Sequence, residues 1–337
     1  MKIIVDVMSG DNAPLALLRG AVMAAEEYEE AEITVVGNRP LLEKLAEENE
    51  IPLDKLKIEH ANSVIDMEDK PLCVVREKKD SSMSVGLELL KKGEGDAFVS
   101  AGNTGALIAG ATLLVRRIRG VQRAGIATIL PFPHPVMLLD SGANLLLTPE
   151  NQEQFAIMGA TYMEKVFGIE DARVGQLNNG SEYNKGMPLQ VESFITLSKS
   201  GVNFVGNVES KEIPFNACDV LVADGFLGNI LLKYTEGMGK FMLKTMKSLF
   251  YSSTIGKFSG LMLKGQVGIL KKQFDASEYG GAPLLGIAKP VIKAHGSSDD
   301  VALKNAVRQA ITFVKTGINE VIEHRLAEKK PTVSVGV

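Results

Sequence analysis

Short, continuously apolar runs alternate with longer helical patterns along almost the whole chain, and this alternation limits the folds open to it. The runs are rich in Val, Ile and Leu, which is typical of strands buried on both faces of a mainly parallel sheet. The predicted strands cover residues 3–7, 33–37, 56–60, 97–100, 126–130, 136–140, 173–178, 203–208 and 220–223. The predicted helices cover residues 15–28, 41–49, 83–92, 104–117, 150–167, 189–198 and 299–326. This order indicates an α/β fold in which helices cover both faces of a doubly wound sheet.

Composition and charge exclude several classes of protein. The 337 residues include 37 Lys and Arg against 41 Asp and Glu, and the resulting net charge of −4 argues against a nucleic-acid partner. Cys73 and Cys218 form no CxxC motif, and the four histidines form no HExxH motif. We therefore expect no disulfide framework and no histidine-based metal site. We likewise expect no other metal site and no cofactor.

The sequence also predicts where the protein resides. No apolar run reaches the roughly 18 residues that a membrane span needs. The longest one, at residues 106–115, ends at Arg116 and Arg117. The chain enters a strand-like segment at once, with no signal peptide ahead of it, so we expect a cytoplasmic protein.

Residues 237–274 differ from the rest of the chain. They contain seven lysines and no Asp or Glu, so the remaining residues carry a net charge of −11. Lysines and apolar residues both recur at helical spacing, which predicts a pair of basic amphipathic helices that protrude as an arm. The alternatives for this arm are a dimerisation surface and a surface for an acidic partner or an anionic membrane. Its candidate contact residues are Lys240, Lys244, Lys247, Lys257, Lys264 and Lys271.

This segment divides the chain into three parts. Residues 1–236 and 275–328 are predicted to form a single α/β catalytic unit, into which the arm at 237–274 is inserted. Residues 329–337 are predicted to form a frayed tail.

Five loops that follow predicted strands share one composition, with Asp or Asn beside Gly and other small residues. They cover residues 6–14, 100–106, 140–144, 178–186 and 224–229. Because ligands bind beyond the carboxyl ends of the strands in an open parallel sheet, we expect all five loops to meet along one edge. Glycine lets backbone N–H groups approach a ligand, and Asn or Asp supplies fixed polar contacts. Asp11, Asn12 and Asn144 are the candidate substrate-loop residues.

Two of these loops are candidates for binding an anion. Gly102, Asn103, Thr104 and Gly105 open a helix directly after a strand, where unpaired N–H groups and partial positive charge favour an anion. The alternative is a simple helix cap by Asn103 or Thr104. The loop at 178–186 adds Gly180, Ser181 and Lys185, with a solvent-exposed turn lysine as the alternative.

His295 is a further candidate. It lies between a strand-like segment at 290–293 and a capped helix, where a structural hydrogen bond is the alternative to a catalytic role.

Several catalytic motifs are missing. There is no GxxxxGK[ST] phosphate loop, no GxGxxG after a strand and no GxSxG nucleophile elbow. Cys73 and Cys218 lie in apolar stretches and are expected to pack rather than react. Anion-binding loops without a covalent nucleophile suggest that the substrate supplies its own, and inorganic phosphate is such a nucleophile.

Seven motifs in this order resemble those of the bacterial acyl-ACP:phosphate acyltransferase family, and the similarity runs over about residues 2–325. The motifs are GDNAP at 10–14, KKDSSM at 78–83, SAGNTGA at 100–106, GNVE at 206–209, DGFLGN at 224–229, YGGA at 279–282 and AHGSS at 294–298. The family resemblance implies an isocitrate/isopropylmalate dehydrogenase-like fold. One departure is Ser9, which stands where the family usually has a second Gly.

The resemblance also implies a function. Inorganic phosphate would attack the thioester of fatty acyl-ACP and form acyl phosphate, the first committed step toward glycerophospholipid synthesis. The implied partners are acyl carrier protein, inorganic phosphate, a second copy of the chain, and either a peripheral membrane contact or a membrane-bound glycerol-phosphate acyltransferase. The protein would be cytoplasmic and peripherally membrane-associated.

The residues suggest roles in such a reaction. Lys185 would neutralise phosphate, Asn103 or Asn229 would donate to the oxyanion, His295 would orient phosphate or protonate the thiolate, and Asp224 would orient. Three alternatives remain open. They are a phosphate acetyl- or butyryltransferase acting on acyl-CoA, a metal-dependent β-decarboxylating dehydrogenase, and a non-catalytic lipid-binding protein built around the arm.

Overall fold

The computed structural model describes residues 1–273 and 280–328. Its strands form one sheet of eleven, in the order β3-β2-β1-β4-β11-β10-β5-β6-β9-β7-β8. The strands are β1 Lys2–Asp6, β2 Glu32–Gly37, β3 Leu56–His60, β4 Ala97–Ser100, β5 Gly125–Leu130, β6 Val136–Leu139, β7 Val174–Asn178, β8 Phe204–Glu209, β9 Val220–Val222, β10 Ala282–Leu285 and β11 Val291–Lys293. All nine predicted strands are confirmed within two residues. β11 lies in the strand-like segment expected at 290–293, and the predictions missed β10.

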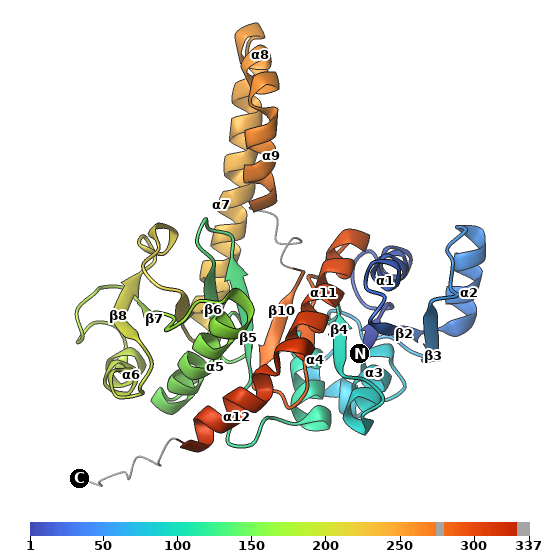
Figure 1. Cartoon of the computed structure of the whole chain (residues 1–337), viewed down its shortest axis with the longest axis horizontal. Helices are drawn as coiled ribbons and strands as arrows, with labels where there is room; N and C mark the ends of the chain where they lie inside the picture. The colour runs from blue at the N-terminus through green and yellow to red at the C-terminus, as the bar shows by residue number, and fades with distance from the viewer. Residues whose placement is uncertain (274–279, 329–337) are drawn as a thin grey trace.

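Helices flank this sheet (Figure 1). They are α1 Leu15–Glu27, α2 Arg39–Glu48, α3 Ser82–Lys92, α4 Thr104–Gly110, α5 Pro149–Phe167, α6 Pro188–Ser198, α7 Gly225–Tyr251, α8 Thr254–Met262, α9 Lys264–Gln273, α11 Asp300–Thr316 and α12 Ile318–Glu328. Short helical turns add η1 Pro71–Val75, η2 Ala111–Val115 and η3 Ile213–Phe215. The single helix predicted at 299–326 is two helices, because Gly317 takes a left-handed conformation (φ 57°) that ends α11.

The strands do not all run the same way. β10 is antiparallel to both of its neighbours, and β5 is antiparallel to β6. As a result β1, β4 and β11 point in one direction, whereas β6, β7 and β9 point in the other. The prediction that all five polar loops meet along one edge is therefore wrong. The six residues of β5 cross the sheet between the two edges, a length of roughly 20 Å at about 3.4 Å per residue.

Three hydrophobic cores hold the layers together. The first is continuous across one face of the whole sheet and includes Ile3 from one half and Val220 from the other. The opposite face is divided into two cores. One lies under α3 and α4 and includes Phe98, and the other lies under the start of α7 and includes Leu221. The two cysteines are buried, and burial raises the pKa of both thiols, to about 12 for Cys218.

The basic segment projects from the body as α7, α8 and α9 (Figure 1). The chain forms one long helix and two short ones here, instead of the predicted pair. The predicted boundary between residues 236 and 237 falls inside α7, which begins at Gly225, where Asp224 caps it. Phe274 and the tail at 329–337 lie outside the described residues. Among the described residues, no helix combines the length and the apolar character needed to cross a bilayer.

Candidate active site

Three polar side chains form a row across the carboxyl ends of neighbouring parallel strands. Ser100 of β4 is in register with Asp6 of β1 on one side and with Lys293 of β11 on the other. Residues two positions earlier, such as Phe98 and Val291, belong to the core under α3 and α4, so the row lies on that face of the sheet. Asp6 and Ser100 are fully buried, and the hydroxyl of Ser100 donates to the Asp6 carboxylate at 2.8 Å.

Burial changes the protonation equilibrium of the carboxyl group in this row. It raises the pKa of Asp6, while the nearby hydroxyls of Ser82, Ser9 and Ser100 offset part of the rise. Only the Ser100 hydroxyl makes a full hydrogen bond, since those of Ser9 and Ser82 find no partner in good geometry. Ser9 does not adopt a positive φ, so the Gly-to-Ser departure at this position carries no backbone strain.

The loop after β1 is joined to the loop after β11. The Asp11 N–H donates to the Gly296 carbonyl at 2.8 Å. The Asn12 amide donates to the carbonyls of Ser297 and Ser298 at 3.1 and 3.2 Å. His295 is exposed between them, and its Nδ1 lies 2.9 Å from the Ser297 hydroxyl. Asp11, Asn12 and His295 are therefore brought together, with the His295 Nε2 free of any partner in the described chain.

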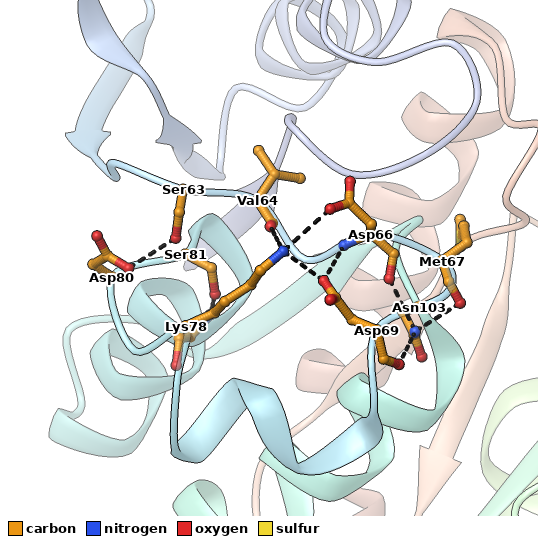
Figure 2. Close-up of polar contacts among 10 residues, drawn as sticks. Ser63, Val64, Asp66, Met67, Asp69, Lys78, Asp80, Ser81 and Asn103 are labelled. Carbon is orange, nitrogen blue, oxygen red and sulfur yellow. Dashed lines mark hydrogen bonds and ion pairs between the residues drawn. The ribbon is translucent and has the colours of Figure 1, made fainter.

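Both polar atoms of the Asn103 side chain form hydrogen bonds within the described chain, and Figure 2 shows those of the nitrogen. Its Oδ1 accepts from the Ala106 N–H at 3.0 Å and caps α4. Its amide nitrogen donates to the carbonyls of Asp66, Met67 and Asp69 at 3.1, 3.0 and 3.0 Å. The predicted capping alternative is what the structure shows, and an oxyanion would have to compete with three carbonyls for this amide.

The segment that Asn103 holds is also fixed by Lys78, as Figure 2 shows. The Lys78 ammonium donates to the Val64 carbonyl at 2.8 Å and to the carboxylates of Asp66 and Asp69 at 3.1 and 2.6 Å. The hydrogen bond to Lys78 lowers the pKa of Asp69, and the same bond raises the pKa of Lys78. This ion-pair cluster positions residues 64–69 beside the start of α4.

Two backbone donors remain open at the start of α4. The Gly102 N–H donates to the Ser100 hydroxyl at 3.1 Å, and the Leu107 N–H donates to the Asn103 carbonyl. In the described chain the N–H groups of Thr104 and Gly105 have no acceptor outside their own helix. These two open donors agree with the anion-binding site predicted at residues 102–105, which stays a prediction.

A second polar cluster lies on the opposite edge, after β6. Asp140 is fully buried, and its carboxylate accepts from the N–H groups of Ile126, Gly142, Ala143 and Asn144 at 2.7 to 3.1 Å. Burial raises its pKa, and these donors oppose the rise. The Asn144 amide is consumed by the Ala124 carbonyl and the Asp140 carboxylate, at 2.7 and 2.8 Å.

Asp224 and Asn229 belong to this second cluster. The Asp224 carboxylate caps α7 by accepting from Phe226 and Leu227 at 3.0 and 2.9 Å. The Asn229 amide donates to the Ser141 carbonyl at 3.1 Å. In this structure both side chains hold α7 against the loop at 140–144.

Lys185 follows β7, whose carboxyl end lies on the same edge of the sheet as that of β6. Its side chain is exposed, and its carbonyl accepts from the Asn178 amide at 3.0 Å. Ser181 is exposed and Gly180 is buried in the same loop. The structure therefore places Gly180, Ser181 and Lys185 away from Gly102–Gly105, so the two predicted phosphate loops do not share an edge of one chain.

Sequence reasoning missed Lys293 and the role of Lys78. A lysine at the last position of an apolar strand was a usable signal, because lysine is seldom buried without a partner. Within the described ranges, no group of three or more His, Cys, Asp or Glu side chains could hold a metal ion.

Solved structures share this architecture. A phosphotransacetylase from Streptococcus pyogenes matches with a TM-score of 0.59 at 16% identity, over 95% of this chain and 94% of that one. A branched-chain phosphotransacylase from Enterococcus faecalis V583 matches with a TM-score of 0.56 at 12% identity, over 94% of this chain and 100% of that one. At such identities the likeness shows the fold alone. It confirms the predicted α/β class with a mainly parallel sheet.

Sequence comparison is more specific than the fold. The family model described as fatty acid synthesis protein matches residues 1–321. A phosphate acyltransferase from Thermoanaerobacter pseudethanolicus is 44% identical over 325 residues, which cover 96% of each chain. Another, from Clostridioides difficile strain 630, is 44% identical over 330 residues, which cover 97% of each. The chain belongs to the fatty acid synthesis protein family and is an acyltransferase that acts with phosphate.

Proposed function

We propose that the enzyme transfers a fatty acyl group from acyl carrier protein to inorganic phosphate. The observation that carries this proposal is the 44% identity to phosphate acyltransferases along 96% of the chain. A phosphate oxygen forms a bond to the thioester carbon, the carbon–sulfur bond breaks, and the carrier thiolate leaves and takes up a proton. The products are acyl phosphate and free carrier protein.

The edge formed by β1, β4 and β11 is the proposed place of reaction. It offers the open N–H groups of Thr104 and Gly105 to a phosphate oxygen and the exposed His295 to the leaving sulfur. Asp11 and Asn12 fix the loop that carries His295, so that the imidazole has a defined position.

The opposite edge holds the remaining predicted residues. We assign Asp224, Asn229 and Asn144 to positioning, because each is engaged in holding α7 and the loop at 140–144. Gly180, Ser181 and Lys185 stay a competing proposal for the phosphate site. His295→Ala and Lys185→Ala decide between the two edges, since only the variant at the reacting edge should lower phosphate-dependent turnover by roughly 10²-fold or more.

The arm is the proposed contact for the donor. Lys240, Lys244, Lys247, Lys257 and Lys264 are all exposed and form no salt bridge with the described residues, which suits an acidic carrier protein. The side chain of Lys271 lies outside the described set. Exposed apolar residues on the same helices, such as Phe241 and Phe258, suit a second copy of the chain or a membrane surface. A cytoplasmic, peripherally membrane-associated homodimer that passes acyl phosphate to a membrane-bound glycerol-phosphate acyltransferase belongs to the same proposal.

A direct assay tests the reaction. Purified protein is incubated with palmitoyl-ACP with and without phosphate, and release of free carrier protein is measured by gel shift. Phosphate-dependent release with an acyl phosphate product is expected. Release that ignores phosphate, or none at all, overturns the proposal.

The phosphotransacylase-like fold makes acyl-CoA the alternative donor. Parallel reactions with palmitoyl-CoA, acetyl-CoA and palmitoyl-ACP at equal concentration separate the two. A higher kcat/KM for either CoA ester would assign the enzyme to acyl-CoA.

A further inference from the structure

Lys293 places a positive charge at the reacting edge without a counter-ion in contact. Its ammonium donates to the carbonyls of Ala101 and Ala294 at 3.2 and 2.5 Å. Among the described residues, no carboxylate oxygen lies within 4.0 Å of this nitrogen, although eight other lysines of the body form such pairs. An ammonium has three N–H groups, so one donor is left over.

The surroundings of Lys293 disfavour its charged form. Burial lowers the pKa of Lys293 to about 8, and the carboxylates of Asp11 and Asp6 only partly offset the effect. A partly desolvated cation with carbonyl partners alone is unfavourable unless an anion completes its shell. An apolar residue would continue the Val291-Ile292 pattern without this cost, so Lys293 is unfavourable for folding.

The position of Lys293 fits a ligand at this edge. It ends β11 in register with Ser100, and the carbonyl it binds belongs to Ala101, three residues before Thr104. On its other side its register partner is the small Ala282 of β10. The cation therefore lies next to the loop whose Thr104 and Gly105 N–H groups are open.

We propose that Lys293 is a phosphate-binding residue of this enzyme and holds the attacking inorganic phosphate through its third N–H. The proposal rests on the proposed function and makes it more specific, because it names a cation that neither the loops nor the family motifs identify. The two carbonyl bonds fix the ammonium in direction, and the phosphate supplies the missing counter-charge. Lys293 also ties the loop after β4 to the loop after β11, which keeps phosphate and His295 in one place.

The kinetic test compares two lysines that flank the same strand. Lys293→Met removes the charge and keeps the length of the side chain. Lys289→Met is the matched control, since Lys289 is also half-buried and bound to a carbonyl, that of Gly95, but at the opposite end of β11. K293M is expected to raise the KM for phosphate by about 10- to 100-fold, as for loss of a charge-assisted hydrogen bond, with the KM for palmitoyl-ACP unchanged. K289M should leave both constants as they are.

The outcomes separate this proposal from the reaction itself. If the wild type releases carrier with phosphate and K293M keeps the same phosphate KM, Lys293 is not the phosphate ligand and the proposed function stands. If the wild type shows no phosphate-dependent release, the proposed function fails. Isothermal titration with inorganic phosphate then still reports on Lys293, because saturable binding by the wild type and its loss in K293M would support the site.

A labelling experiment on the wild type covers the case in which K293M does not fold. The protein is treated with limiting acetic anhydride at pH 8, with and without inorganic phosphate, and acetylation of each lysine is quantified by mass spectrometry. Phosphate should protect Lys293 and leave Lys289 unchanged. Equal labelling of Lys293 in both samples overturns the proposal.

Discussion

Gly228 is the position where one added methyl group should do the most damage to the junction between α7 and the sheet. A Cβ atom at this residue would lie 2.0 Å from the Asp140 carbonyl oxygen and 3.0 Å from its carbon. Because these are backbone atoms, α7 has to move by more than 1 Å, and we expect a cost at the upper end of the overpacking range, about 3 kcal/mol. The helix-propensity gain of Gly→Ala offsets about 1 kcal/mol. Gly228→Ala should therefore lower the free energy of unfolding by about 2 kcal/mol.

The same helix supplies the control. A Cβ atom at Gly237 meets nothing within 4 Å, so Gly237→Ala should leave stability unchanged or raise it by up to about 1 kcal/mol. Urea unfolding followed by far-ultraviolet circular dichroism measures both, since the chain has no Trp to report by fluorescence. Equal midpoints for the two variants would show that the contact between α7 and Asp140 is not tight and would refute the reasoning.

Three further predictions concern the two edges and the arm. Asp140→Ala leaves the buried Ile126 N–H without an acceptor, whereas the N–H groups of residues 142–144 can bond to water. We therefore expect the free energy of unfolding in urea to fall by about 1–3 kcal/mol, and a fall below about 0.5 kcal/mol would contradict this. Phosphate affinity should fall as pH rises through about 8, because Lys293 then loses its proton and its positive charge. The other titratable groups at this edge are Asp6, Asp11 and His295. In K293R the fall should vanish, and titrations from pH 7 to 9 check it. Replacing Lys240 and Lys244 together by Glu should raise the KM for acyl-ACP several-fold at low salt and leave the KM for phosphate unchanged. If the double variant and the wild type have identical kinetics with acyl-ACP, these lysines have no docking role.

The pattern of apolar runs was enough to predict the elements of the fold. Runs such as the one at β9 are apolar at every position, and that composition is typical of strands covered on both faces. β10 was missed because Ala282 and Pro283 break its pattern, and Pro is a poor signal for a strand inside a sheet. The direction of each strand was harder to predict, because an apolar run shows the same pattern whichever way the strand points.

One signal for direction was nevertheless present in the sequence. Only residues 131–135 link β5 to β6, and a parallel pair needs a crossover of a dozen or more residues. That short link fixes the pair as antiparallel and places the loop after β6 on the far edge. The candidate site divided at this point. The sequence was enough to group Asp11, Asn12, residues 102–105 and His295. It could not predict the hydrogen bonds of Asn103, Asn144 and Asn229, because these side chains bond to carbonyls far away in the sequence, such as those of Asp66 and Ser141.

The division between the edges also explains why the two polar clusters differ in chemistry. On the far edge every acceptor of Asp140 meets a donor from its own loop or from Ile126, and such a satisfied cluster gains nothing from a ligand. On the reacting edge Lys293 keeps an unused donor, and the start of α4 keeps two. Folding alone would favour filling those donors, because a desolvated charge costs free energy that an apolar side chain would not. Open donors beside a half-buried cation are what an anion site requires, and they favour the proposed phosphate site beside β11 over the competing proposal at the exposed Lys185 after β7.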